Sequence, residues 1–336
     1  MKRIVTFGEV MMRLSPPAYA KFSQATSLDL AYGGGEANVA ISLAYMGMDA
    51  VHVTRFPDNL IGKSATQFLR HHWVDTSSIL YGGDLMGKYF LEKGAVHRSS
   101  KVVYEREKSS FAQVEPAMFN WNTIFQDADW FHWTGITPAI SVGAAECCKE
   151  AIQFARSKGI IVSADINSRK NLWNYGKKQQ DVMPELIAGC DVVIAGSRDI
   201  REIFGFDVEG NKEEEFINAA IQLSEACEGV KKVFDKEREM LSASHNRIQG
   251  KVWNGKRFIK AKKLDVTHIV DRVGTGDAYA AGVIYGLLHY QKDEEALSFA
   301  TAACALKHTV EGDANIIALE DVQELMHGNT SGKIKR

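Results

Sequence analysis

The fold of this chain is decided by the stretch Asp271-Arg272-Val273-Gly274-Thr275-Gly276-Asp277-Ala278. It follows a β-rich run at residues 266–270 and precedes an apolar, small-residue segment at residues 278–288, so it predicts a loop that feeds a helix. Its two glycines let the backbone approach a ligand closely, and the first-turn amides of a helix offer unpaired N–H donors to an anion. The carboxylate of Asp277 is costly in such a place unless it has a task. Accepting a proton from a hydroxyl beside a phosphate is such a task.

The composition is that of a globular protein, with 45% hydrophobic and 24% charged residues in a chain of 336, so we expect a sizeable core. The net charge of −2 argues against a binder of nucleic acids or membrane surfaces, because such proteins usually carry a basic excess. The five cysteines show no C-x-x-C spacing, so neither a zinc site nor a disulfide framework is indicated. No run reaches the roughly 18 apolar residues of a membrane span, and no cleavable apolar leader is present. We therefore expect a cytoplasmic protein with small-molecule partners.

Strands alternate with helices through the middle of the chain. The strand-like and helical segments, in order, lie at residues 130–133, 142–157, 160–164, 184–188, 191–195 and 212–227. This alternation predicts an α/β fold with a mostly parallel central sheet and helices on both of its faces.

Two regions outside this alternation, residues 11–32 and 86–112, carry strand-like sequence and predict a small β lid. Residues 239–246 predict a polar loop. We expect a single domain over residues 1–325, followed by a polar, basic tail at residues 328–336 that is predicted to be disordered.

A second glycine-rich stretch, Gly33-Gly34-Gly35-Glu36-Ala37-Asn38, leads into a helical pattern. Three glycines before a helix indicate a backbone that another group approaches closely, although a plain flexible turn has the same signature. Two similar patterns fail as nucleotide motifs. The Gly-Lys-Ser at residues 62–64 lacks the first glycine of a Walker A loop, because position 57 is Pro57. The Gly-x-Gly of the opening stretch lacks the third glycine of a dinucleotide motif, because position 279 is Tyr279.

Two arginines are candidates for binding an anionic substrate. Tyr104 and Arg106 lie two positions apart in a strand-like run and are expected to face the same side of it. The alternative is an exposed, charged edge strand, since acidic and basic residues surround them. Arg169 follows the strand at residues 160–164, where ligands gather in open α/β sheets. It is either a solvated side chain or a planar fork that binds a carboxylate.

Together these motifs resemble the ribokinase-like (PfkB) carbohydrate kinases over about residues 3 to 320, including the closing D-x-x-G-x-G-D pattern at residues 271–277. The chain also resembles the 2-keto-3-deoxygluconate kinases within that family. The motifs that carry this second resemblance are Gly8-Glu9, Tyr104-Glu105-Arg106, His132-Trp133-Thr134-Gly135, Asp165-Ile166-Asn167-Ser168-Arg169 and Ser242-Ala243-Ser244-His245-Asn246.

The resemblance implies ATP-dependent phosphorylation of a sugar primary hydroxyl, here the 6-hydroxyl of 2-keto-3-deoxygluconate. Asp277 would be the general base, and the amides of Gly274, Thr275 and Gly276 would hold the charge of the transferring phosphoryl group. The implied substrate-binding residues are Gly33, Gly34, Asn38, Tyr89, Tyr104, Arg106 and Arg169. The two arginines would receive the carboxylate, because a neutral sugar would leave them unpaired at a cost of several kcal/mol.

The resemblance also implies ATP and Mg2+ as cofactors and a monovalent cation such as K+ near Asp271. Two departures from the family pattern concern these groups. Gly196-Ser197-Arg198-Asp199 stands where relatives carry N-x-x-E, so Asp199 is the candidate to hold magnesium through water. Lys236-Glu237-Arg238-Glu239 stands in place of G-x-x-G, so positive groups such as Arg238 would contact ATP with two acids beside them.

Two other functions stay open at this stage. One is a kinase of a neutral sugar of the fructose or ribose type, or of a nucleoside, on the same fold. The other is a non-catalytic sugar-binding regulator, which the altered metal motif suggests. The β edges and aromatic residues of the lid also predict a homodimer that pairs through it.

Overall fold

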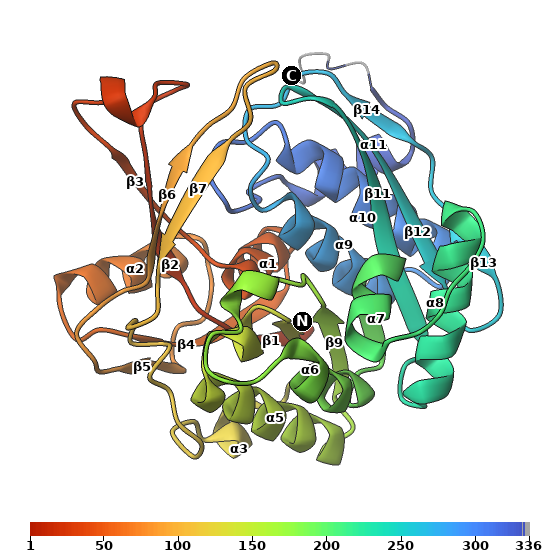
Figure 1. Ribbon diagram of the computed structural model, residues 1–336, viewed down its shortest axis with the longest axis horizontal. Coiled ribbons are helices and arrows are strands. Elements are labelled where there is room, and N and C mark those ends of the chain that lie inside the picture. The colour runs from red at the N-terminus through yellow and green to blue at the C-terminus, as the bar shows by residue number, and fades with distance from the viewer. Residues whose placement is uncertain (331, 333–336) are drawn as a thin grey trace.

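The computed structural model describes residues 1–330 and 332, and it shows a large sheet, a small sheet and two layers of helices (Figure 1). The large sheet has ten strands, with the order β13-β12-β11-β10-β9-β8-β1-β4-β5 and β14 paired to β12. The strands are β1 (Arg3–Phe7), β4 (Asp49–Phe56), β5 (Ile79–Tyr81), β8 (Trp130–Thr134), β9 (Ile161–Asp165), β10 (Val192–Ile194), β11 (Lys232–Ser242), β12 (His245–Trp253), β13 (Phe258–Lys260) and β14 (Leu264–Val266). From β5 to β11 every pairing is parallel, whereas β12 pairs antiparallel with β11, β13 and β14.

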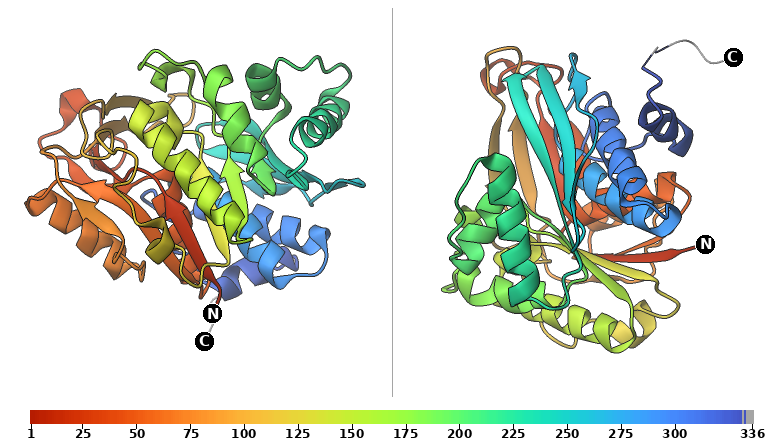
Figure 2. Two further views of the ribbon diagram at one scale, coloured as in Figure 1. Left: turned by 90° about the horizontal axis from the view of Figure 1, so that it is seen from below. Right: turned by 90° about the vertical axis from the view of Figure 1, so that its right-hand side faces the viewer.

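Helices cover both faces of this sheet (Figure 2). One face is covered by α1 (Gly35–Tyr45), α2 (Leu60–His71), α9 (Thr275–His289), α10 (Asp293–Lys307) and α11 (Leu319–Met326). The other is covered by α3 (Trp121–Ile124), α4 (Thr137–Ile140), α5 (Val142–Ser157), α6 (Gln179–Ala188), α7 (Ser197–Phe204) and α8 (Lys212–Ala226). The alternation of β1 feeds both cores, because Ile4 points to the first and Val5 and Phe7 point to the second. The predicted α/β class is confirmed.

Helix α9 is buried almost all round, which its small residues permit. A Cβ on Gly282 would lie 2.6 Å from the Cα of Ala300, and one on Gly286 would lie 2.7 Å from the Cα of Ala296. These glycines therefore let α9 and α10 pack closely.

The small sheet is built from β2 (Met11–Ser15), β3 (Asp29–Gly33), β6 (Lys88–Glu92) and β7 (Lys101–Glu105), in the order β3-β2-β6-β7. It stands beside the carboxyl ends of the large sheet (Figure 1). A 3-10 turn, η1 (Phe22–Gln24), lies between β2 and β3, and another, η2 (Lys170–Leu172), follows β9. The predicted small β-sheet is confirmed, and the single domain over residues 1–325 stays a prediction.

Three local predictions need correction or limitation. Residues 239–246 are not a loop, because β11 and β12 continue through them as one antiparallel hairpin with a bulge near its tip. Polarity misled the prediction, since both faces of the far half of this hairpin are partly exposed. The β-rich run at residues 266–270 forms a strand only up to Val266. The predicted disorder at residues 328–336 falls largely outside the described residues. Within residues 1–330 and 332, none of the helices combines the length and apolarity needed to cross a membrane.

Candidate active site

The opening stretch forms the N-terminus of α9, as predicted. Gly274 is the N-cap residue with φ of 76°, a left-handed conformation that favours glycine. A Cβ at this position would also overlap the carbonyl oxygen of Asp313. Thr275 begins the helix and donates its hydroxyl to the carbonyl oxygen of Arg272 at 3.0 Å. The first-turn amides of Thr275, Gly276 and Asp277 are therefore held in a fixed loop.

Asp277 is a buried carboxylate poised near neutral pH. Burial raises the pKa of its carboxyl to about 7, and the negative charge of Asp165 raises it further, while a hydrogen bond from Asn38 lowers it. That bond runs from Nδ2 of Asn38 to Oδ2 of Asp277 at 2.7 Å and joins α1 to α9. A carboxylate with this pKa, at the positive end of a helix, suits a general base that works at physiological pH.

The glycines before α1 are close-packed by the protein itself. A Cβ on Gly34 would overlap the carbonyl oxygen of Glu9, and one on Gly33 would overlap the carboxylate of Asp313. The close approach predicted for this stretch is therefore real, and it places Asn38 on the first turn of α1 facing Asp277.

One cavity of about 450 Å³ brings most of the predicted site residues together. The predicted residues that line it are Gly33, Gly34, Asn38, Tyr89, Tyr104, Arg169, Asp199, Arg238, Gly274, Thr275, Gly276 and Asp277. They come from both sheets and from the starts of α1, α7 and α9. Arg106 and Asp271 are not among the lining residues.

Strand β11 presents a cationic face to this cavity. Lys236 and Arg238 lie two positions apart, so they face the same side of the strand, and both line the cavity. Arg238 donates from Nη2 to Oγ1 of Thr275 at 2.7 Å, and Nζ of Lys236 lies 5.0 Å from the centre of the Tyr279 ring. Both cations therefore stand beside the first turn of α9.

The two acids of the same segment point to the opposite face of β11. Glu237 lies 3.9 Å from Nζ of Lys212, and Glu239 lies 3.5 Å from both Arg247 and Lys263. Neither acid lines the cavity. The alternation of a strand thus separates the positive charges from the negative ones.

Sequence reasoning named Lys236 only as one of the positive groups of its segment, and it missed Arg272 as a site residue. Arg272 lines the cavity, and its Nη2 donates to Oδ1 of Asn246 at 3.1 Å. Burial, together with the positive charge of Arg238, lowers the pKa of Arg272. A basic residue inside the anion-binding motif was the available signal. Three cations near one helix N-terminus are an arrangement that attracts a polyphosphate.

Acidic side chains line another part of the cavity. Asp199 lies in the first turn of α7 and accepts a hydrogen bond from the amide of Gly196 at 3.4 Å. Asp165, at the end of β9, and Asp235, on β11, line the cavity as well. Burial raises the pKa of both Asp165 and Asp199. Among the residues that the structure describes, no group of three or more potential ligands is arranged to hold a metal ion directly.

Arg106 takes a different place from the one its spacing predicts. Strand β7 ends at Glu105, so the alternation that relates Tyr104 to Arg106 does not continue. Tyr104 is half exposed, whereas Arg106 is buried and donates from Nε to Oε2 of Glu9 at 2.7 Å. Its Nη2 also contacts that oxygen. Arg106 is therefore paired with an internal carboxylate.

Asp271, predicted to help hold a monovalent cation, is likewise occupied by internal donors. Its carboxylate accepts hydrogen bonds from Nη2 of Arg13 at 2.7 Å, from the amide of Val273 at 3.0 Å and from the amide of Gly312 at 3.3 Å. Asp271 therefore bonds to the backbone of the loop before α9 and does not line the cavity.

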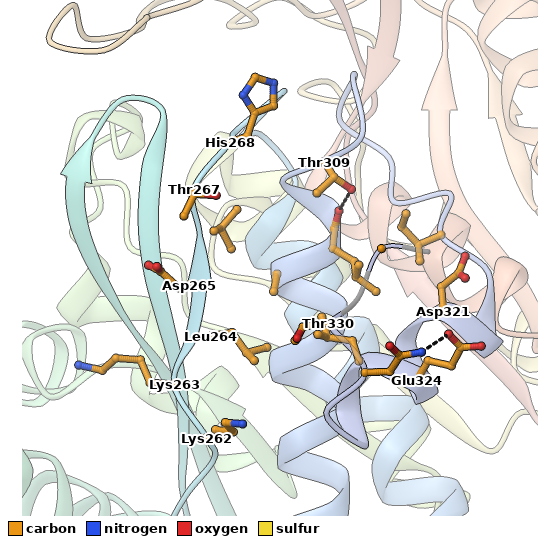
Figure 3. A pocket seen from close by; sticks show the side chains of 17 residues that line it. Lys262, Lys263, Leu264, Asp265, Thr267, His268, Thr309, Asp321, Glu324 and Thr330 are labelled. Atoms are coloured by element: carbon orange, nitrogen blue, oxygen red, sulfur yellow. Dashed lines mark hydrogen bonds between the residues drawn. The ribbon is translucent and has the colours of Figure 1, made fainter. Parts of the chain in front are cut away.

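A second and larger hollow, of about 1060 Å³, lies between β14 and the helices α10 and α11 (Figure 3). Apolar residues such as Leu264, Leu306 and Leu325 line it together with charged residues such as Lys262 and Lys263. In the described part of the chain it shares no lining residue with the cavity around Asp277. Size alone therefore does not identify the site, and the chemistry lies in the smaller cavity.

The fold and this cavity define a class of protein. A helix N-terminus with a glycine N-cap, a buried carboxyl with a pKa of about 7 and a cationic strand face are features that suit the transfer of a phosphoryl group to a hydroxyl. A sequence profile of the pfkB family of carbohydrate kinases matches residues 1–319. The chain belongs to this family, so the predicted family is confirmed.

Individual relatives cover nearly the whole chain. The sequence is 30% identical over 329 residues to the 2-dehydro-3-deoxygalactonokinase of Haloferax volcanii, with 98% of each chain covered. It is 26% identical over 310 residues to the 2-dehydro-3-deoxygluconokinase of Bacillus subtilis, covering 92% of this chain and 90% of that one. The crystal structure of the 2-dehydro-3-deoxygluconokinase of Thermotoga maritima is similar, with a TM-score of 0.93, 39% identity, and 97% and 98% of the two chains covered.

Proposed function

We propose that this protein is a cytoplasmic, ATP-dependent kinase of a 2-keto-3-deoxy sugar acid, acting on the 6-hydroxyl of 2-keto-3-deoxygluconate. The observation that carries the proposal is that Arg169, an exposed residue in the segment after β9, lines the cavity of Asp277, and that β9 lies two strands away from the cations of β11. Lys236 and Arg238 would bind the phosphates of ATP. Arg169 would bind a second anionic group, which belongs to the acceptor. The names of the similar proteins support a sugar acid of this class.

In the proposed reaction, the carboxylate of Asp277 accepts the proton of the 6-hydroxyl, whose oxygen attacks the γ-phosphorus of ATP. The bond from that phosphorus to the bridging oxygen of ADP breaks, and ADP leaves with its electron pair. The amides of Gly274, Thr275 and Gly276 hold the charge on the transferring group, an effect of about 3 to 4 kcal/mol per donor. Asn38 keeps the Asp277 carboxylate in one orientation.

Lys236, Arg238 and Arg272 would contact the ATP phosphates. Mg2+ supplies charge neutralisation between the phosphates when it is bound. Because the described residues include no direct ligand cluster, the ion would arrive with ATP, and Asp199 would hold one of its water molecules from the first turn of α7.

Arg169 and Arg106 would receive the sugar carboxylate. Glu9 engages Nε and Nη2 of Arg106, and a guanidinium has five N–H donors, so Nη1 stays available to a second carboxylate. Ser109 also donates to Glu9. Glu9 would therefore hold the fork of Arg106 in position, while Tyr89 and Tyr104 border the sugar from the lid.

The test is an ADP-release assay with 2-keto-3-deoxygluconate, its C4 epimer 2-keto-3-deoxygalactonate, fructose and ribose. We expect turnover on one or both sugar acids. Arg169→Ala should lower kcat/KM for the acid by about 10- to 150-fold, the loss of a charge-assisted contact. Arg198→Ala is the matched control, because Arg198 lines the same cavity with an exposed side chain that no predicted substrate contact uses. Turnover on fructose or ribose with none on either acid would refute the proposal.

One observation favours the neutral-sugar alternative, namely that Glu9 already pairs with Arg106. The fructose and ribose arms of the assay decide that point. If the protein is a non-catalytic regulator, calorimetry should detect sugar binding that Mg2+ does not change, and no product should form.

We also propose a homodimer through the lid, because all five residues of the edge strand β7 are exposed. Light scattering behind size exclusion measures that mass directly.

A further inference from the structure

Two carboxylates lie buried directly behind the anion-binding loop. The side chains of Asp271 and Asp313 are 2% and 4% exposed. Asp271 accepts the amide of Val273, and the carbonyl of Asp313 packs against Gly274. Two uncompensated negative charges here would weaken a loop that binds phosphates, and burying them unpaired is costly. Some cation must therefore stand between them.

That cation comes from the chain itself. Arg13, on the lid strand β2, donates from Nη2 to Asp271 and from Nη1 to Asp313, both at 2.7 Å. Its Nε donates to Oγ of Ser15 at 3.0 Å. The Arg13 side chain is 4% exposed, so the guanidinium bridges the two acids in the interior, where such pairs are screened least.

Every oxygen of the two carboxylates has a donor. Tyr89 donates its hydroxyl to Oδ2 of Asp313, and the amide of Gly312 donates to Oδ2 of Asp271, in addition to the bonds from Arg13 and Val273. A metal ion needs free oxygen lone pairs. Five donors therefore already contact these four oxygens, and a metal ion would have to compete with them for lone pairs.

A second basic side chain, Lys307, lies near the two carboxylates. Lys307 is fully buried, donates from Nζ to the carbonyl oxygen of Val310 at 2.9 Å, and lies in the field of both carboxylates. Burial lowers the pKa of Lys307, so Arg13 is the cation that pairs with both carboxylates. Because the guanidinium of Arg13 already lies between the two carboxylates, an added K+ would be held beside a buried positive charge, so the residues do not fit the monovalent cation that the resemblance implied near Asp271.

We infer that Arg13 is a positioning residue that replaces a monovalent cation behind the anion-binding loop, so that this kinase needs no K+. Through Asp271 and Asp313 it holds the turn at Gly274, whose amide and neighbours contact the transferring phosphoryl group. The inference rests on the proposed kinase function. Arg13, a residue of the lid, would thus neutralise the two carboxylates in place of an ion from solution.

The first experiment compares the unmodified protein in K+ and in tetramethylammonium at equal ionic strength, by turnover and by thermal melting. We expect the two salts to give the same kcat and the same Tm. A saturable, K+-specific rise in Tm or in kcat would overturn the inference. Absence of turnover in both salts would count against the proposed function instead, and the melting comparison would still decide the present point.

The second experiment is Arg13→Ala, assayed with K+ and with guanidinium added in turn. We expect kcat to fall about 100-fold while KM for ATP changes little, and added guanidinium or K+ to restore part of kcat. Arg55→Ala is the matched control, because Arg55 is a half-buried arginine that donates to carbonyl oxygens far from the loop. It should show no rescue. An Arg13→Ala variant as active as the unmodified protein would overturn the inference.

Discussion

The pH dependence of turnover tests the role of Asp277 most directly. Its pKa is raised to about 7, mainly by burial. The base must be ionised to accept a proton, so kcat/KM should rise with pH and level off above about pH 8. With a pKa of about 7, roughly one eleventh of the carboxyls are ionised at pH 6 and roughly ten elevenths at pH 8, so the rate should change about tenfold between them.

Two substitutions should move this rising limb of the pH profile of kcat/KM in opposite directions. Asn38→Leu removes the hydrogen bond that stabilises the ionised form at 2.7 Å. A hydrogen bond to a charged group is worth about 1.5 to 3 kcal/mol, and 1.36 kcal/mol corresponds to one pKa unit. The midpoint of the rising limb should therefore move up by about one to two pH units. Asp165→Asn removes a negative charge that raises the pKa of Asp277, so it should move the limb down.

The assay is kcat/KM by coupled ADP release from about pH 5.5 to 9.5, since kcat/KM reports the ionisation of the free enzyme. Coupling enzymes must be in excess at every pH, and thermal melts of each variant show that it is folded. If the limb stays in place in both variants, or moves the same way in both, it belongs to another group. The assignment of Asp277 as the base would then be refuted.

Three further predictions concern activity and stability. Gly274→Ala should abolish turnover and lower Tm, because its Cβ would overlap the carbonyl of Asp313 at a left-handed position. Asp277→Asn should also abolish turnover, yet its Tm at pH 8 should exceed that of the unmodified protein. His52 and His132 have pKa values lowered to about 3 by burial. Below about pH 6.5 the unfolded chain therefore binds more protons than the folded chain. For each pH unit by which the pH is lowered from there toward about 3, the free energy of unfolding should fall by about 1.4 kcal/mol per histidine. Denaturant titrations at several pH values measure this slope, and His132→Gln should reduce it.

Local patterns predicted the parts of the site that are local in the chain. The loop at residues 271–277 and the start of α9 depend on glycine conformations and helix-end chemistry, which act over a few residues. The sheet followed from the alternation of strands and helices. Asn38 and Asp277 are 239 residues apart, and the resemblance to a family, not spacing, placed them in one site.

Partners that depend on the tertiary fold could not be predicted. The pairing of Arg106 with Glu9 spans 97 residues, and that of Arg13 with Asp271 spans 258. No periodicity links such positions. The hairpin of β11 and β12 is different, because the alternation of Lys236 and Arg238 with acids was visible in the sequence. Its polarity was read as a loop, although a strand with two solvated faces has the same composition.

The site carries a cost in stability that its chemistry explains. Asp277 has its pKa raised from 3.8 to about 7 by folding. A raised carboxyl pKa means that the folded state binds the proton more tightly than the unfolded state. The contribution of Asp277 to the free energy of unfolding therefore falls as the pH rises from about 4 to 7, and it is constant above about pH 7. At 1.36 kcal/mol per unit the loss approaches about 4 kcal/mol, and Asn, which cannot ionise, avoids it. The same burial and the same negative neighbours make the carboxylate basic enough to take a hydroxyl proton at neutral pH. A site in which the pKa of Asp277 stayed near 3.8 would therefore be more stable, and its carboxylate would be a poorer base.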